Sequence, residues 1–146
     1  MTQCVGCMSA KDVYHEVVKT ILQKDGWIIT HDPLILKFAS NRHLRIDLGA
    51  EQLIIAQKDT RQIAVEIKSF LAPSEITEFH LALGQFLNYR VGLKKKHIER
   101  TLYLAVPLET YQDFFLEEFT QISLQEYQVK LLVFDPENEV IVRWIE

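Results

Sequence analysis

Apolar residues recur every three or four positions in some segments of the chain and every second position in others. Residues 9–25 and 74–90 show the first spacing, which predicts two amphipathic helices. Ser9 and Ser74 stand where the N-caps of these helices are expected. A shorter helix is predicted over 109–119, with an apolar face formed by Phe114, Phe115 and Phe119.

Alternating apolar and polar positions fill the remaining segments and predict strands. The resulting order is helix, three strands, helix, strand, helix, two strands. A polar turn at 58–61 would join the second and third strands as a hairpin, and Gly49 would form a bulge in the second. This order favours a mixed α/β (α+β) fold in which helices flank a mixed sheet. The expected strand segments are 27–39, 43–57, 62–70, 101–106, 129–134 and 140–145.

Length and charge narrow the class of protein. The 146 residues predict a single domain over 9–146 after a disordered tail, residues 1–8. Because the net charge is −4, contact with nucleic acid would need a local basic patch. No apolar run approaches ~18 residues and the N-terminus lacks a signal pattern, so we expect no membrane span and a cytoplasmic location. Cys4 and Cys7 form a CxxC pair without a second pair of zinc ligands.

Two charges stand in the otherwise apolar stretch "AVEIKSF". Alternation places Glu66 and Lys68 side by side on one face of their strand. With the hairpin turn centred on residues 59–60, Lys68 faces Glu51, diagonal to Glu66, and Asp47 has the same parity four residues away. Carboxylates and a lysine in this arrangement suit a divalent cation and a phosphate. A solvated face with an ordinary Glu51–Lys68 ion pair is the alternative, and the spacing leaves it open.

The element order over residues 9–106 and the sequence "VEIK" resemble the PD-(D/E)XK nuclease superfamily, whose restriction-endonuclease-like core is αβββαβ. The chain would add a C-terminal helix and strands to that core. The resemblance implies phosphodiester hydrolysis with Mg²⁺ or Mn²⁺, and it makes Glu66 and Lys68 catalytic. By spacing it also implies Glu51 as the catalytic acid and metal ligand of the preceding strand, with Asp47 as a second ligand. The chain departs from the motif in having Ala-Glu where the family has Pro-Asp.

A further likeness lies in the helix after the E-x-K strand. Gln85 and Tyr89 form the Q-x-x-x-Y pattern of the RecB-like branch, which implies a role in substrate binding, and an i,i+4 pair shares one helix face. Some branches add a glutamate from the first helix. Glu16 would be its equivalent, but it falls on the polar side of that helix. His15 is expected to be a packed or hydrogen-bonded residue.

Over most of its length the chain also resembles the XisH family, cyanobacterial fdxN element excision controlling factors. The segments that carry the resemblance are "DGWIITHDPL", "DLGAEQLIIAQK", "IAVEIKSF", "ALGQFLNYR", "LYLAVP" and "LLVFDPENEVIVRWIE". It implies control of a programmed DNA excision, together with an XisI-like partner protein and a site-specific recombinase. DNA binding and a homodimer are further expectations. The alternative to an endonuclease is a non-catalytic accessory protein that uses the same fold to bind XisI, a recombinase or DNA.

Overall fold

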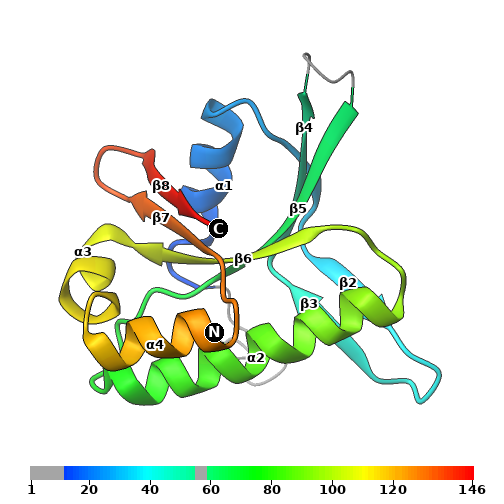
Figure 1. Cartoon of the computed structure of the whole chain (residues 1–146). Helices are drawn as coiled ribbons and strands as arrows, with labels where there is room; N and C mark the ends of the chain where they lie inside the picture. The colour runs from blue at the N-terminus through cyan, green and yellow to red at the C-terminus, as the bar shows by residue number, and fades with distance from the viewer. Residues whose placement is uncertain (1–11, 55–58) are drawn as a thin grey trace, which may run out of the picture.

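The computed structural model of the chain describes residues 12–54 and 59–146. Its six-stranded sheet has the order β1-β4-β5-β6-β7-β8, and β2 and β3 form a separate two-stranded sheet (Figure 1). The strands are β1 (Ile28–His31), β2 (Leu34–Lys37), β3 (His43–Ile46), β4 (Leu48–Ile54), β5 (Asp59–Ile67), β6 (Thr101–Pro107), β7 (Leu131–Asp135) and β8 (Val140–Ile145). The helices are α1 (His15–Lys24), α2 (Glu75–Lys95), α3 (Leu108–Thr110), the π-helical η2 (Tyr111–Phe115) and α4 (Glu118–Glu126).

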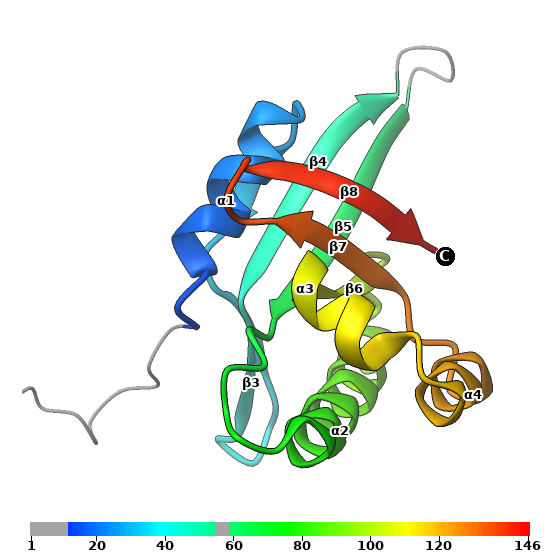
Figure 2. The same ribbon diagram turned by 90° about the vertical axis from the view of Figure 1, so that its left-hand side faces the viewer.

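The sheet is mixed, as the sequence predicts. β6 runs parallel to β5 and to β7, and the other neighbours in the sheet are antiparallel. The parallel step from β5 to β6 is bridged by α2, as a crossover connection requires. Figures 1 and 2 show α1 on one face of the sheet and α2 with α4 on the other. The predicted mixed α/β fold with flanking helices is therefore confirmed.

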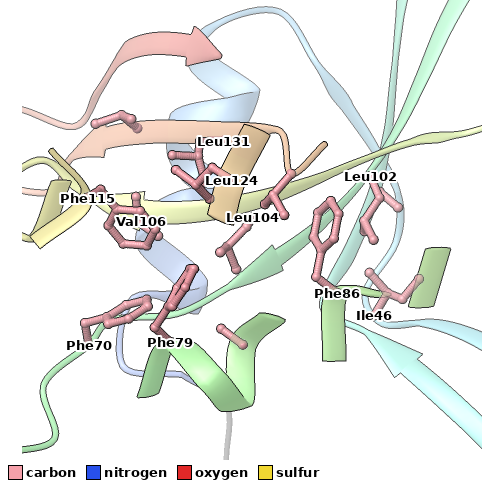
Figure 3. Close-up of a cluster of buried hydrophobic side chains, with 14 of the residues drawn as sticks. Ile46, Phe70, Phe79, Phe86, Leu102, Leu104, Val106, Phe115, Leu124 and Leu131 are labelled. Carbon is pink, nitrogen blue, oxygen red and sulfur yellow. The ribbon is translucent and has the colours of Figure 1, made fainter. Parts of the chain in front are cut away.

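Alternation along the strands divides the core between the two faces. In β5, Ile63, Val65 and Ile67 pack with the buried face of α1, whereas Ala64 packs in the cluster that contains residues of α2 and α4. Figure 3 shows this second cluster. Glu66 has the parity of Ala64, so the fold places a carboxyl group on the α2 side of a buried strand.

Packing extends α2 beyond its predicted end. Ser74 caps the helix as predicted, because its Oγ accepts a hydrogen bond from the Thr77 N–H at 3.3 Å. The predicted end of this helix at residue 90 was wrong, since the helix continues to Lys95. Gly92 and Leu93 are buried in this last part. The Gly92 backbone lies against the β2–β3 hairpin, and that contact outweighs the polar character of the segment.

The hairpin of β4 and β5 differs from the prediction in its turn and register. The polar turn predicted at 58–61 was wrong, because β5 begins at Asp59. Val65 pairs with Leu48, whereas the predicted turn would pair it with residue 54, so the observed register differs from the predicted one by six residues. Gly49 lies in a regular part of β4, and the bulge-like shift occurs in β1, opposite it.

The third predicted helix is divided into three segments. Phe114 and Phe115 are buried, as expected of an apolar helix face, but Phe119 is exposed because the chain begins a new helix at Glu118.

The predicted tail of residues 1–8 and the cap at Ser9 lie outside the described residues. No helix in the described ranges is long and apolar enough to span a bilayer.

Candidate functional site

Two carboxyl groups meet where β4 and β5 begin to pair. Leu48 pairs with Val65, so Asp47 and Glu66, the next residues outward, lie opposite each other. The Asp47 N–H donates to Glu66 Oε1 at 3.3 Å, and the Ile67 N–H donates to Asp47 Oδ2 at 2.7 Å. The strand pairing itself therefore fixes both acids.

These two acids are largely withdrawn from water. Glu66 is only 5% exposed. Burial, and then the neighbouring Asp47 charge, raise the pKa of Glu66 to about 9. Burial also raises the pKa of Asp47, and the hydrogen bond from the Ile67 N–H only partly offsets this effect. The pair therefore keeps a proton near neutral pH, and a divalent cation would compete with that proton.

Lys68 lies beside this acid pair on the same face of the sheet. Its Nζ is 4.0 Å from Glu66 Oε2, and its side chain is mostly buried. Its backbone N–H donates to the Ala105 carbonyl at 3.0 Å, which continues the alignment of β5 with β6. The side-by-side placement of Glu66 and Lys68 that alternation predicts is thus observed.

His15 approaches the acid pair from the first turn of α1. Its Nε2 lies 2.7 Å from Asp32 Oδ1, and its Nδ1 lies 4.0 Å from Asp47 Oδ1. The Lys19 ammonium donates to the other oxygen of Asp32 at 2.9 Å. Although burial raises the pKa of Asp32, the bonds from Lys19 and His15 lower it below its ordinary value. His15 Nδ1 is buried and has no hydrogen-bond partner among the described residues.

Asp12 attaches the start of α1 to the strand that carries the site. One of its carboxylate oxygens accepts from the Tyr14 N–H at 2.9 Å, and the other accepts from the Ser69 N–H at 2.8 Å. Ser69 directly follows Lys68. The first turn of the helix, with His15, is therefore held next to the end of β5.

α2 contributes the two residues of the Q-x-x-x-Y pattern. Burial, together with the charges of Glu66 and Asp47, raises the pKa of Tyr89 to about 12, so its hydroxyl lies within electrostatic range of the acid pair. Gln85 stands one turn earlier on the same helix face. Its Oε1 is buried and has no hydrogen-bond partner within the described part of the chain.

Glu51 does not join this group, and its predicted position beside Lys68 was wrong. It pairs with Gln62, whose Nε2 donates to Glu51 Oε2 at 3.4 Å. That position is four residues, or about 13 Å, along the strand from Asp47. A single cation cannot bridge that distance, so Asp47, and not Glu51, is the acid that lies next to Glu66.

Asp47 and Glu66 could hold a cation through their carboxylate oxygens, and His15 Nδ1, which lies 4.0 Å from Asp47 Oδ1, could reach a cation bound at Asp47. Carboxylate and imidazole groups are ordinary ligands of divalent cations. A separate group, His15, Glu16 and Asp32, has ligand atoms that all lie within 4.8 Å of one another, which the set of His15, Asp47 and Glu66 does not. Lys19 already supplies the positive charge at Asp32, which makes that second group a less suitable cation site.

The expectation that His15 is a packed or hydrogen-bonded residue is confirmed, because it is 3% exposed and its Nε2 lies 2.7 Å from Asp32 Oδ1. Its partner Asp32 was not predicted. Asp32 precedes Pro33 close to the start of β2, and no periodicity predicts that this segment returns to α1. The contact between residues 15 and 32 is tertiary, and only the fold reveals it.

These features define a mixed α/β protein with a buried acid–acid–lysine site beside a histidine. The profile of the XisH family, described as "XisH protein", matches residues 8–142. The chain therefore belongs to the XisH family. Among curated proteins, no match to the chain was found.

Two solved structures are similar to the chain. The crystal structure of an XisH family protein from Nostoc punctiforme PCC 73102 is 49% identical, with a TM-score of 0.83, over 92% of this chain and 100% of that one. The crystal structure of a fdxN element excision controlling factor protein from Anabaena variabilis is 52% identical, with a TM-score of 0.82, over 93% and 100% of the two chains. Both comparisons agree with the family assignment.

Proposed function

We propose that this XisH-family protein is a metal-dependent DNA endonuclease of the PD-(D/E)XK type that takes part in the control of programmed DNA excision. The observation that carries the proposal is the convergence of Asp47, Glu66 and Lys68 at the start of the β4–β5 pair. An acid pair that holds a proton at neutral pH is costly to bury. A divalent cation that displaces the proton would offset this cost by binding both carboxylates.

The proposed ligands are the carboxylates of Asp47 and Glu66, with His15 Nδ1 approaching from the side of Asp47. A bound cation would supply Lewis-acid stabilisation of the charge that develops on the phosphate. Mg²⁺ prefers oxygen ligands, whereas a set that includes imidazole nitrogen also suits Mn²⁺. We therefore expect Mn²⁺ to bind at least as tightly as Mg²⁺.

In this proposal, Lys68, Tyr89 and Gln85 act on the phosphodiester substrate. The Lys68 ammonium is held near the acids, where it stabilises negative charge on the phosphodiester and orients the attacking water. Tyr89 and Gln85 offer a hydroxyl and an amide from α2 that fix the position of the substrate backbone. These roles follow from proximity and from the chemistry of the groups.

The biological setting is proposed from the relatives. The protein from Anabaena variabilis is named a fdxN element excision controlling factor. By analogy, we propose that this chain acts on DNA during excision, with an XisI-like protein and a site-specific recombinase as partners. The alternative is an accessory role in which the fold binds these partners without cutting DNA.

Titration calorimetry with Mn²⁺ and cleavage assays on plasmid DNA test the proposal. Asp47→Asn and Glu66→Gln should abolish both metal binding and cleavage. Glu51→Gln should change neither by more than about 2-fold, because Glu51 lies four residues from the site. Lys68→Ala should bind metal and reduce cleavage roughly 100-fold or more.

A matched control is Lys24→Ala, which removes an exposed lysine of α1 that pairs with Glu139. It should leave binding and cleavage unchanged. If the wild-type protein binds no Mn²⁺, or if Asp47→Asn binds it as well as the wild type does, the endonuclease proposal is wrong. If metal binds but Lys68→Ala supports excision as well as the wild type, the accessory role is correct.

A further inference from the structure

A line of charged and polar groups leads from the surface of α1 to the candidate metal site. Lys19 Nζ donates to Asp32 Oδ2 at 2.9 Å, and Asp32 Oδ1 lies 2.7 Å from His15 Nε2. The other ring nitrogen of His15, Nδ1, lies 4.0 Å from Asp47 Oδ1. Because Lys19 and His15 are one helical turn apart, α1 presents both to the same carboxylate.

This geometry selects one tautomer of the neutral imidazole. The Asp32 carboxylate only accepts hydrogen bonds, so Nε2 must carry the ring proton in order to donate to it. Nδ1 then has a lone pair and no proton. His15 is only 3% exposed, and Nδ1 has no hydrogen-bond partner among the described residues. A buried nitrogen lone pair 4.0 Å from a carboxyl oxygen is a ligand that a divalent cation at Asp47 could use.

We propose that Asp32 and Lys19 are positioning residues for the metal site: they hold His15 with its proton on Nε2, so that the Nδ1 lone pair is free to bind a divalent cation held by Asp47. This inference rests on the proposed function in one respect, namely that a cation binds at Asp47 and Glu66. A carboxylate behind a metal-ligating histidine is a recurring arrangement that fixes ring orientation and makes the ligand more basic.

Lys19 has a specific part in the arrangement. It fixes one oxygen of Asp32 and leaves the other for His15. In Asp32→Asn, the amide oxygen would turn to the Lys19 ammonium and the amide NH₂ would turn to His15 Nε2. The NH₂ group only donates, so Nε2 would have to accept and the ring proton would move to Nδ1. The proton would then occupy the metal-facing nitrogen.

The test compares ring tautomers and metal affinities in the full chain. In the metal-free wild-type protein at mildly alkaline pH, ¹⁵N NMR of the His15 ring should show the Nε2–H tautomer. Asp32→Asn should show the Nδ1–H tautomer, and its Mn²⁺ affinity in calorimetry should fall by about 10- to 100-fold. Glu139→Gln removes the acid of an exposed ion pair with Lys24, also on α1, and is the matched control. It should alter neither readout.

The double variant Lys19→Met, Asp32→Asn separates orientation from charge. Without the ammonium, the amide is free to turn its oxygen to His15 Nε2–H, so the Nε2–H tautomer and most of the Mn²⁺ affinity should return. If Asp32→Asn lost Mn²⁺ affinity only because the negative charge of Asp32 is missing, the double variant would not regain that affinity. Circular dichroism of each variant confirms that its fold is retained.

Two results overturn the positioning role. One is an Asp32→Asn protein that keeps the wild-type tautomer and binds Mn²⁺ within about 2-fold of the wild type, while Asp47→Asn still abolishes binding. The other is a double variant that recovers neither property. In both cases the metal site survives and only the inference fails. If Asp47→Asn and Glu66→Gln bind Mn²⁺ normally, the proposed function itself fails.

Discussion

At the residue scale, Glu66 is subject to opposing effects. Burial and the facing Asp47 favour its protonated form, whereas the Lys68 ammonium favours the carboxylate, and the first two prevail. The metal-free protein therefore keeps a proton on Glu66 where the unfolded chain has lost it. Stability from this group is complete below its ordinary pKa of 4.5 and is lost as the pH rises toward about 9.

Replacing Glu66 with glutamine should remove this pH-dependent loss. With EDTA present, we expect Glu66→Gln to be more stable than the wild type at alkaline pH by about 1 kcal/mol or more, a Tm increase of about 2–4 °C, and the difference should shrink in acid. Mn²⁺ should raise the Tm of the wild type but not of the variant. Thermal unfolding across pH measures both effects. A variant less stable than the wild type at every pH would contradict this account.

At the scale of helices and strands, the local sequence pattern determines some structural features and tertiary packing determines others. Periodicity is sufficient to predict the end of α1, the start of α2 and the parity that sets Glu66 and Lys68 on one face, although it begins the first helix too early, since α1 starts at His15. It does not give the register of β4 against β5. The residues Asp59–Arg61 are polar and resemble a turn, yet they belong to β5 because the Arg61 guanidinium lies over the rings of Trp27, Tyr103 and Trp144.

The register of β4 against β5 determines which acid lies in the candidate site. The predicted register differs from the observed one by six residues, so it brings Glu51 instead of Asp47 close to Glu66 and Lys68. Because six is an even number, the side chains stay on the predicted face of the sheet. The sequence therefore predicts the shared face of Glu66 and Lys68 correctly, but it places Glu51 rather than Asp47 nearest to them. The rings that bring Arg61 into the strand come from three distant segments, and short-range pattern does not reveal them.

Two glycines of α2 test how far packing governs this helix. A Cβ added at Gly92 would lie 2.8 Å from Leu44 Cδ1 and 3.1 Å from Leu36 Cδ1, whereas one added at Gly84 would meet nothing within 4 Å. Both alanine variants gain the same helix propensity, about 1 kcal/mol. The difference between them isolates the contact with the β2–β3 hairpin.

We expect Gly84→Ala to stabilise the protein and Gly92→Ala to be less stable than Gly84→Ala by about 1–3 kcal/mol. Urea unfolding monitored by circular dichroism gives the free energy of unfolding for each variant. Equal stabilities would mean that the leucine side chains of the hairpin move aside without cost, and that the hairpin does not determine how closely α2 packs.

At the scale of the whole molecule, the C-terminal strand returns to the N-terminal part of the sheet. Trp144 of β8 packs against Trp27, which precedes β1, with ring centroids 5.7 Å apart, and against Tyr103 of β6. Glu146 accepts hydrogen bonds from the Tyr103 hydroxyl and from Arg61. Sheet twist thus brings residues near both edges of the sheet together around one guanidinium.

Arg61 and Trp144 should therefore be energetically coupled. Arg61→Ala and Trp144→Ala each remove part of the same cluster, so the double variant should lose less free energy of unfolding than the sum of the single losses. The expected coupling is on the order of 0.5–1 kcal/mol, the range for a partly exposed cation over an aromatic ring. Arg61 lies five residues along β5 from Glu66, so the Mn²⁺ affinity of the folded variants should match that of the wild type. Additive losses in the double-mutant cycle would show that Arg61 and Trp144 stabilise the fold independently of each other. A fall in Mn²⁺ affinity would show that the two ends of β5 are not independent.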